Sequence, residues 1–135
     1  MTRIRLLFPL VALAVLVLAG PADAASVKGK WKGTVKIVRG GSGSFAMKMT
    51  IKSTKVGSRA GTLSNPGKPC RGTLRVTSRG NGGYFLRYRE RSRSSMCTGN
   101  DRIFIKRKGK RLHWKATAPG GTQIGKALLR RVRAR

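Results

Sequence analysis

Acidic residues are the scarcest feature of this sequence. It holds three Asp and Glu residues against 31 Lys and Arg, which gives a formal net charge of +28. One of the three, Asp23, lies in a leader that we expect to be removed, so Glu90 and Asp101 remain in the rest of the chain. A charge of this size repels itself in a compact state and favours anionic partners, although it says nothing about the fold.

Groups for acid–base chemistry are almost as scarce. His113 is the only histidine, and its alternation with Leu112 and Trp114 predicts that it points outward. A general acid–base pair needs titratable groups with shifted pKa values in a pocket. We expect Glu90 to pair with a neighbouring arginine and Asp101 to lie at a turn. With no phosphate-binding loop, nucleophile elbow or metal motif, the sequence predicts a protein that is not an enzyme and has no cofactor or metal site.

Only one long apolar run is present, Leu6–Gly20, and it follows a basic start. Together with the small residues of Ala22–Ala24, it has the three parts of a secretory signal peptide. The run is shorter than the roughly 20 apolar residues that span a bilayer, so we favour a cleaved leader over an uncleaved anchor. We therefore expect a signal peptide at 1–24 and a single domain at 25–135. The protein is predicted to be secreted and extracellular, or periplasmic or cell-envelope in a Gram-negative source.

Cysteine is also sparse, with Cys70 and Cys97 as the only two. In an exported chain, an oxidising compartment favours one disulfide between them. The chain-entropy model gives such a bond a stabilisation of roughly 3–4 kcal/mol. One histidine and two cysteines do not make a zinc site.

Helical periodicity is almost absent, whereas apolar and polar residues alternate throughout. Period-two alternation with one apolar face is typical of half-buried strands. About eight such segments are separated by Gly-, Pro- and Asn-bearing turns, and we expect the last to be centred on Ile124 and Leu128. A sheet of this size must close or split into two layers to bury its apolar face. The sequence predicts an all-β fold, a single small antiparallel barrel, with a β-sandwich as the alternative. The segments are 30–39, 44–53, 60–64, 70–79, 84–94, 102–107, 110–116 and 122–132.

The stretch FLRYRERSRS, Phe85–Ser94, sets arginine at every second position. Because Tyr84, Leu86 and Tyr88 alternate with these arginines, the stretch is predicted to be a strand with a charged outer face. A tight hairpin at 80–83 would pair Val76 with Leu86 and Leu74 with Tyr88. The same register would set Arg75 opposite Arg87 and Arg71 opposite Arg91, and it would bring Cys70 to the end of the sheet where Cys97 lies.

Several short motifs resemble those of a small secreted β-barrel domain of actinobacteria. They are Trp31-x-Gly33, Cys70-x-Gly72-x-Leu74, Tyr88-x-Glu90, Cys97-x-Gly99, Leu112-x-Trp114 and the ALLRR segment. Similar domains stand alone behind signal peptides or form the extracellular part of membrane serine/threonine kinases. The resemblance implies fold and location, and no defined activity.

A looser likeness is to lipocalin and avidin barrels, which place an arginine of the last strand against a tryptophan of the first. Trp31 with Arg130 or Arg131 would supply that contact here, and such an arginine can lie over the indole as a cation–π pair. We take Trp31, Arg130, Glu90 and the two cysteines as structural residues.

The basic surface is the strongest positive signal for function. Like charges directly opposed on a sheet destabilise it, so opposed arginine rows are hard to explain by solubility alone. We expect a monomer that binds an anionic cell-wall polymer, an anionic lipid surface or, less favoured, a nucleic acid. Two alternatives are a carrier of a small apolar ligand inside the barrel and a structural domain without a ligand. The anion-binding candidates are Arg71, Arg75, Arg79, Arg87, Arg89, Arg91, Arg93, Lys106, Arg107, Lys108, Lys110 and Arg111.

Overall fold

The structure, a computed structural model, describes residues 26–39, 41, 43–94, 97, 99 and 101–133. The expected signal peptide, 1–24, lies outside the described residues. Within the described ranges, the chain forms no helix of the length and apolarity needed to cross a membrane. Its elements are eight strands: β1 (Gly29–Ile37), β2 (Ser44–Ile51), β3 (Arg59–Ser64), β4 (Arg71–Gly80), β5 (Gly83–Glu90), β6 (Arg102–Lys108), β7 (Arg111–Thr117) and β8 (Gln123–Arg131).

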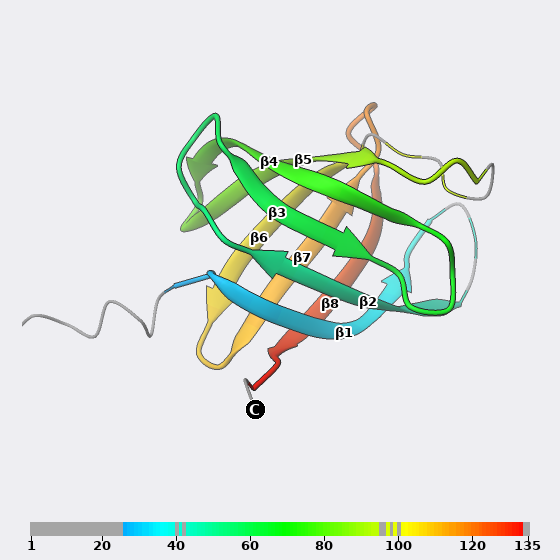
Figure 1. Ribbon diagram of the computed structural model, residues 1–135, viewed down its shortest axis with the longest axis horizontal. Coiled ribbons are helices and arrows are strands. Elements are labelled where there is room, and N and C mark those ends of the chain that lie inside the picture. Colours follow the sequence, from blue (N-terminus) through cyan, green and yellow to red (C-terminus); the bar gives the residue numbers. More distant parts are fainter. Residues whose placement is uncertain are drawn as a thin grey trace, which may run out of the picture.

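The strands form a closed antiparallel barrel in chain order, and pairing of β1 with β8 completes it (Figure 1). The predicted barrel is therefore confirmed over the sandwich. Closure leaves no sheet edge with unpaired backbone groups, which a single open sheet of this size would expose.

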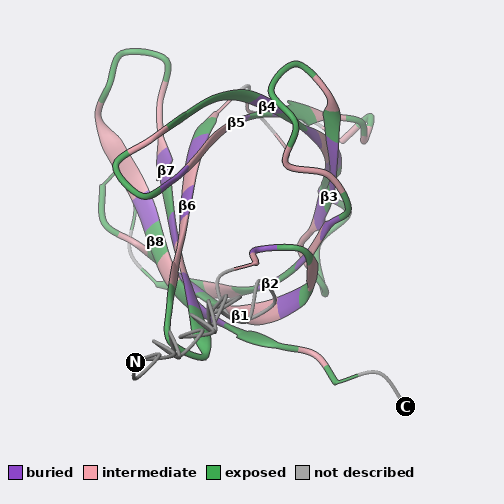
Figure 2. Ribbon diagram, turned by 90° about the vertical axis from the view of Figure 1, so that its left-hand side faces the viewer, coloured by how far each residue is buried: buried purple, intermediate pink, exposed green. Residues whose placement is uncertain are grey.

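Alternation along the strands places the apolar side chains inside the barrel, where they form one core cluster. Figure 2 marks buried residues on strands around the barrel. Trp31, Met49 and Leu74 are each 1 % exposed. Aromatic and sulfur-bearing side chains fill a barrel of this width as an ordinary core. The largest fully buried side chains are Trp31, Met47, Met49, Ile51, Leu74, Leu86, Ile105, Leu112, Leu129, Val35 and Val76.

The β4–β5 hairpin has the predicted register in its central part, with Val76 opposite Leu86 and Arg75 opposite Arg87. Its two-residue turn is formed by Asn81 and Gly82, which have φ values of 53° and 76°. Turns with two positive φ values match the right-handed twist of the flanking strands and favour Asn-Gly.

Two local predictions differ from the structure. The last strand was expected to centre on Leu128, but Leu129 is the buried residue and Leu128 is 51 % exposed. Its neighbours Gly125 and Ala127 face inward with Leu129, opposite Ala116 and Trp114 of β7. The second difference concerns the arginine-rich strand, which ends at Glu90, so the predicted outward row stops before Arg91 and Arg93.

One end of the barrel is covered by the segment that precedes β1, and we call it the Trp31 end. Trp31 Nε1 donates a hydrogen bond of 2.8 Å to the carbonyl oxygen of Val27, which is itself buried. The guanidinium of Arg131 lies 4.6 Å from the indole centroid, and that of Arg107 lies 5.2 Å from it. Both guanidinium groups also donate to the carbonyl oxygen of Ser26. The arginine of β8 over Trp31 is thus Arg131, and Arg130 is an exposed residue opposite Lys32.

The opposite end carries the predicted disulfide, and we call it the disulfide end. Cys70 and Cys97 are bonded with their Cα atoms 5.3 Å apart. The bond ties the connection between β5 and β6 to the start of β4, and the chain between β3 and β4 lies at the same end.

Candidate anion-binding surface

Four arginines lie directly opposite one another across four neighbouring strands, and we call them the arginine row. Arg59 of β3 is the Cα partner of Arg75 in β4, Arg75 is the partner of Arg87 in β5, and Arg87 is the partner of Arg102 in β6. All four are exposed. Residues directly opposite on adjacent strands point to the same face with Cβ atoms about 4.5–5.5 Å apart, so the row presents like charges in close succession on the outside of the barrel.

A β-bulge places Arg59 in this row. The register of β3 against β4 shifts between Arg59 and Gly61, where Ala60 and Gly61 are both buried. A bulge adds one residue to one strand and so reverses the face of the residues beyond it. Without the shift, Arg59 would lie opposite Val76, a core residue that is 1 % exposed.

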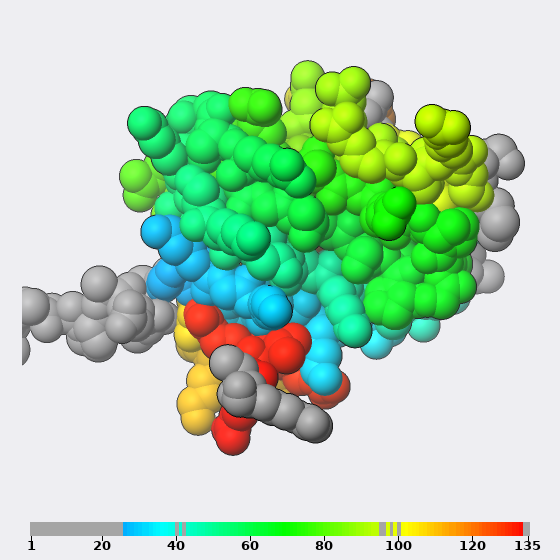
Figure 3. Space-filling view, in the orientation of Figure 1, coloured from blue at the N-terminus to red at the C-terminus, as the bar shows by residue number. Residues whose placement is uncertain are grey.

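The arginine row lines a surface hollow of about 650 Å³. Arg89 and Arg91 extend the hollow towards the disulfide end, and Pro119 of the β7–β8 connection also lines it. In the space-filling view, β3 and β4 lie side by side on one face, and the chain after β5 runs along the edge of that face (Figure 3). The Arg75 side chain is partly fixed, because its Nη1 donates a 2.7 Å hydrogen bond to the carbonyl oxygen of Gly57.

A second basic hollow lies beside the disulfide. Arg71, Arg91 and Arg93 line it together with Lys68. The backbone N–H of Arg91 donates a 2.8 Å hydrogen bond to the carbonyl oxygen of Arg71, which continues the β4–β5 register one residue past the end of β5. The predicted opposition of Arg71 and Arg91 therefore holds in the backbone, although Arg91 is no longer in a strand.

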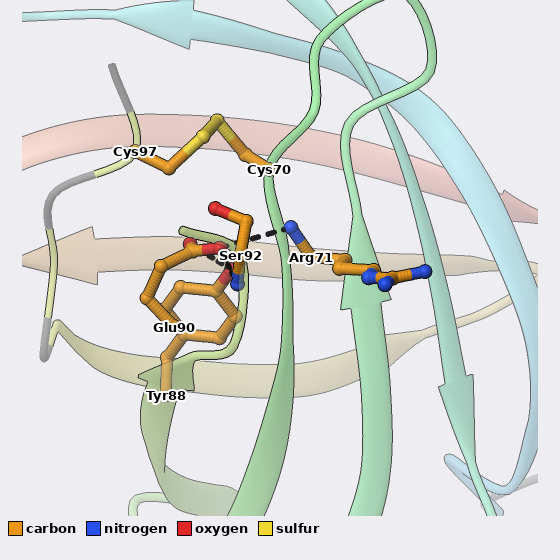
Figure 4. Close-up of a disulfide and its surroundings, with 6 residues drawn as sticks. All are labelled: Cys70, Arg71, Tyr88, Glu90, Ser92 and Cys97. Carbon is orange, nitrogen blue, oxygen red and sulfur yellow. Dashed lines mark hydrogen bonds between the residues drawn. A yellow bond between two sulfur atoms is a disulfide. The ribbon is translucent and has the colours of Figure 1, made fainter. Parts of the chain in front are cut away.

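The carboxylate of Glu90 fixes the chain at this point. It accepts hydrogen bonds from the Tyr88 hydroxyl, the Arg71 backbone N–H and the Ser92 backbone N–H, and the Arg71 side chain points away from it (Figure 4). Glu90 was expected to pair with the side chain of a neighbouring arginine, but it accepts a hydrogen bond from the backbone amide of Arg71. Burial raises the pKa of Glu90, but the hydrogen bonds from Tyr88 and Ser92 outweigh it, and the net pKa lies below its ordinary value. Burial and the neighbouring Glu90 raise the pKa of Tyr88, so its hydroxyl stays a donor.

Both acidic residues of the described chain, Glu90 and Asp101, line a pocket inside the barrel at the disulfide end. Burial and then the charge of Glu90 raise the pKa of Asp101. The pocket has a volume of about 400 Å³, and Trp114 is among the core side chains that line it. Both carboxylates are partly buried and line this pocket, so no acidic side chain of these strands lies among the arginines on the outer face.

Some predicted anion-binding residues lie elsewhere. Arg107 covers Trp31, and burial together with Arg131 lowers its pKa. Arg79 is exposed, but a bulge between Val76 and Ser78 sets it opposite Tyr84, and its guanidinium lies 5.4 Å from that ring.

The remaining candidates are in the β6–β7 hairpin. Lys110 and Arg111 are exposed at its turn, and Arg111 lies opposite Arg130. Lys106 and Lys108 line a third hollow on the outer face of β5–β7. His113, whose imidazole was predicted to point outward, lines the same hollow. Burial and the surrounding lysines lower its pKa, so the imidazole is neutral at pH 7.

In the described part of the chain, no three or more His, Cys, Asp or Glu side chains lie together in a group that could hold a metal ion. Comparisons with protein-family models, with curated proteins and with solved structures find no match.

Two members of the arginine row, Arg59 and Arg102, were missed by reasoning from the sequence. A strand was expected near Leu63, but the bulge that turns Arg59 outward has no signal beyond the adjacent small residues Ala60 and Gly61. Arg102 opens a predicted strand, but the long connection 91–101 left its register against β5 undefined.

Proposed function

We propose that this protein is an exported, non-catalytic binding domain that holds an anionic polymer or surface against the outside of its barrel. The observation that carries the proposal is the arginine row, which sets four exposed arginines opposite one another over four strands. Arginine presents a planar fork of donors that suits phosphate and carboxylate oxygens alike.

Opposed cations have a cost that an anionic partner removes. Each directly opposed like-charged pair destabilises a sheet by a few tenths of a kcal/mol or more. The row contains three such pairs in succession, on a barrel whose backbone hydrogen bonds fix the strands in register. A polymer whose phosphates lie along the row would exchange repulsion for charge-assisted hydrogen bonds and release bound counterions.

A salt series on the purified protein tests the proposal. The probes are inorganic polyphosphate, vesicles containing phosphatidylglycerol and a single-stranded oligonucleotide, each measured between about 50 and 200 mM salt. Tight binding at low salt to at least one probe, with affinity that falls steeply as salt rises, supports the proposal. Absence of binding at low salt, or affinity independent of salt, contradicts it and leaves a structural domain without an anionic ligand.

The pocket inside the barrel favours a second candidate function, a carrier of a small apolar ligand. Core side chains such as Met47 and Ile103 line it, and the buried Trp114 Nε1 and Asn65 Oδ1 have no hydrogen-bond partner among the described residues. A ligand with an apolar body and a polar group would fit such a lining. Native mass spectrometry of the purified protein distinguishes this function, because a bound small molecule adds mass that organic extraction removes.

A further inference from the structure

Two phenylalanines lie together on the outside of the barrel. Phe85 of β5 and Phe104 of β6 are Cα partners, with ring centroids 4.8 Å apart and ring planes tilted by 43°. Their strand neighbours Leu86 and Ile103 are buried in the core, so alternation directs the two rings to the outer face. Both rings are partly exposed and line the third hollow, whose volume is about 570 Å³.

Glycines beneath the rings let them lie against the sheet. A Cβ atom added at Gly83 would lie 2.8 Å from Cζ of Phe104, and one added at Gly80 would lie 3.4 Å from Cε2 of Phe85. Gly80 and Gly83 are themselves partners across the β4–β5 hairpin. The two rings therefore rest on bare backbone and border the hollow, and they do not project from the surface as membrane-inserting side chains would.

Cationic and hydrogen-bonding side chains surround this ring pair. Lys115 of β7 is the direct partner of Phe104, and Lys106 and Lys108 line the same hollow with Asn81 and Thr117. Arg102 lines the hollow as well and is the last member of the arginine row. The aromatic surface is therefore continuous with the row through a shared residue.

Two partly exposed rings beside a row of cations suit a single-stranded nucleic acid better than other polyanions. Base–aromatic stacking tolerates any base, because every base has a π-face, and single-stranded binding proteins combine such stacking with a positive groove for the phosphates. A phosphate polymer without bases has nothing to place on the rings. A DNA duplex keeps its bases stacked in the helix, and its persistence length of about 50 nm prevents it from following the convex barrel over four strands.

We propose that the hollow over Phe85 and Phe104 binds an unpaired base of a single-stranded nucleic acid whose phosphates lie along the arginine row. The inference rests on the proposed function, and it names the polyanion as a single strand. Arg102 would contact the phosphate between the stacked base and the rest of the row. Asn81, Thr117 and the neutral imidazole of His113 would face the base edge or the sugar.

Three probes of equal length separate the base from the phosphates: a labelled oligothymidine, an abasic strand with the same number of phosphates, and a duplex. Fluorescence anisotropy across a salt series gives the affinity for each. We expect oligothymidine to bind about tenfold more tightly than the abasic strand, as one stacked base provides. The salt slopes of the two single strands should be equal, because their phosphate contacts are the same.

Phe85→Leu/Phe104→Leu is the test variant, because leucine keeps apolar cover over the glycines and removes the ring faces. It should bind oligothymidine and the abasic strand with equal affinity, and its abasic affinity should be that of the unaltered protein. Phe85→Tyr/Phe104→Tyr should keep the tenfold preference. Phe45→Leu is the matched control, because it removes another partly buried ring beside a cation, Lys68, at the disulfide end. This control should also keep the preference.

The possible outcomes separate the two proposals. Equal, salt-dependent binding of oligothymidine and the abasic strand overturns the base site and leaves the proposed function standing. A duplex bound as tightly as oligothymidine also overturns the base site, as does a leucine variant that loses vesicle binding while it keeps its preference for bases. If none of the strands binds at low salt while polyphosphate or vesicles do, the base site is wrong and another polyanion occupies the row. Failure of every probe at low salt contradicts the proposed function itself.

Discussion

The role of an arginine in this protein depends on the face of the barrel that it occupies. Arg131 and Arg107 are held over Trp31 at one end of the barrel, where both donate to the carbonyl oxygen of Ser26. Arg130, next to Arg131 in sequence, lies opposite Lys32 on the outer face, whereas Arg131 lies opposite Trp31; both arginines are exposed. Strand alternation alone thus separates a structural arginine from a surface one.

We predict that Arg131→Gln lowers the free energy of unfolding by about 1–2 kcal/mol, because it removes a cation–π contact and a charge-assisted hydrogen bond. Arg130→Gln removes the same charge from the adjacent position and should change the stability by less than about 0.5 kcal/mol. Urea unfolding followed by tryptophan fluorescence measures both. Equal effects of the two substitutions would show that Arg131 does not stabilise the Trp31 end.

At the disulfide end, the stabilising charged residue is Glu90, whose carboxylate accepts three hydrogen bonds. We predict that Glu90→Gln destabilises the protein by about 1.5–3 kcal/mol at pH 7, the range for hydrogen bonds to charged groups. The folded-state pKa of Glu90 is below its ordinary value of 4.5, so the ionised form favours folding. This contribution is fully present above pH 4.5 and is lost as the pH falls through the lower, folded-state pKa. Thermal unfolding from pH 7 to pH 3 should show the two proteins converging in stability. A difference that stays constant with pH would contradict the role of the charge.

At the scale of strands, opposed arginines should be a liability when no polyanion is bound. Arg87 lies between Arg75 and Arg102, so Arg87→Gln/Arg102→Gln removes two of the three opposed pairs of the row. We predict that this variant is more stable than the unaltered protein by about 0.5–1 kcal/mol at low salt. Because salt screens exposed charges, the gain should shrink at about 1 M salt.

The control for this prediction is Lys52→Gln/Lys55→Gln, which removes the same net charge from exposed positions between β2 and β3. Urea unfolding at two salt concentrations compares the variants. An equal gain in the control would mean that total charge and not opposition limits the stability.

The strands also show what the sequence could and could not predict. Alternation of apolar and polar residues was enough for eight strands and the central β4–β5 register, because a one-residue error would have turned core residues such as Val76 outward, but it left a sandwich open beside the favoured barrel. The bulges were not predictable, since each depends on packing between strands. They decide that Arg59 joins the arginine row and that Arg79 lies opposite Tyr84.

Long connections limited the prediction of the site. The segment 91–101 separates β5 from β6, so alternation could place Phe85 and Phe104 on the outer face but could not make them partners. The disulfide was predictable, because two cysteines in a chain that is expected to be exported leave one pairing. Its position beside the arginines of the second hollow required the fold.

For the whole molecule, the barrel separates its charges by location. The core is apolar, the two described carboxylates line the interior pocket, and the outer face of the strands carries the arginine row. A formal charge of +28 would attract any polyanion to some extent, wherever the cations lie. Our proposal assigns binding to the arginine row in particular.

Two charge-matched variants, assayed for binding of a single-stranded oligonucleotide and of polyphosphate, show whether binding depends on the arginine row. Arg87→Gln/Arg102→Gln removes two charges and two opposed pairs from the row, and Arg111→Gln/Arg130→Gln removes two charges that form an opposed pair of β7 and β8 outside the row. We predict that the row variant loses affinity about tenfold or more at low salt and that its salt slope falls by about two, one for each lost phosphate contact. The β7–β8 variant should retain nearly the full affinity and slope. Equal losses in the two variants would contradict the account, because binding would then follow net charge and not the arginine row.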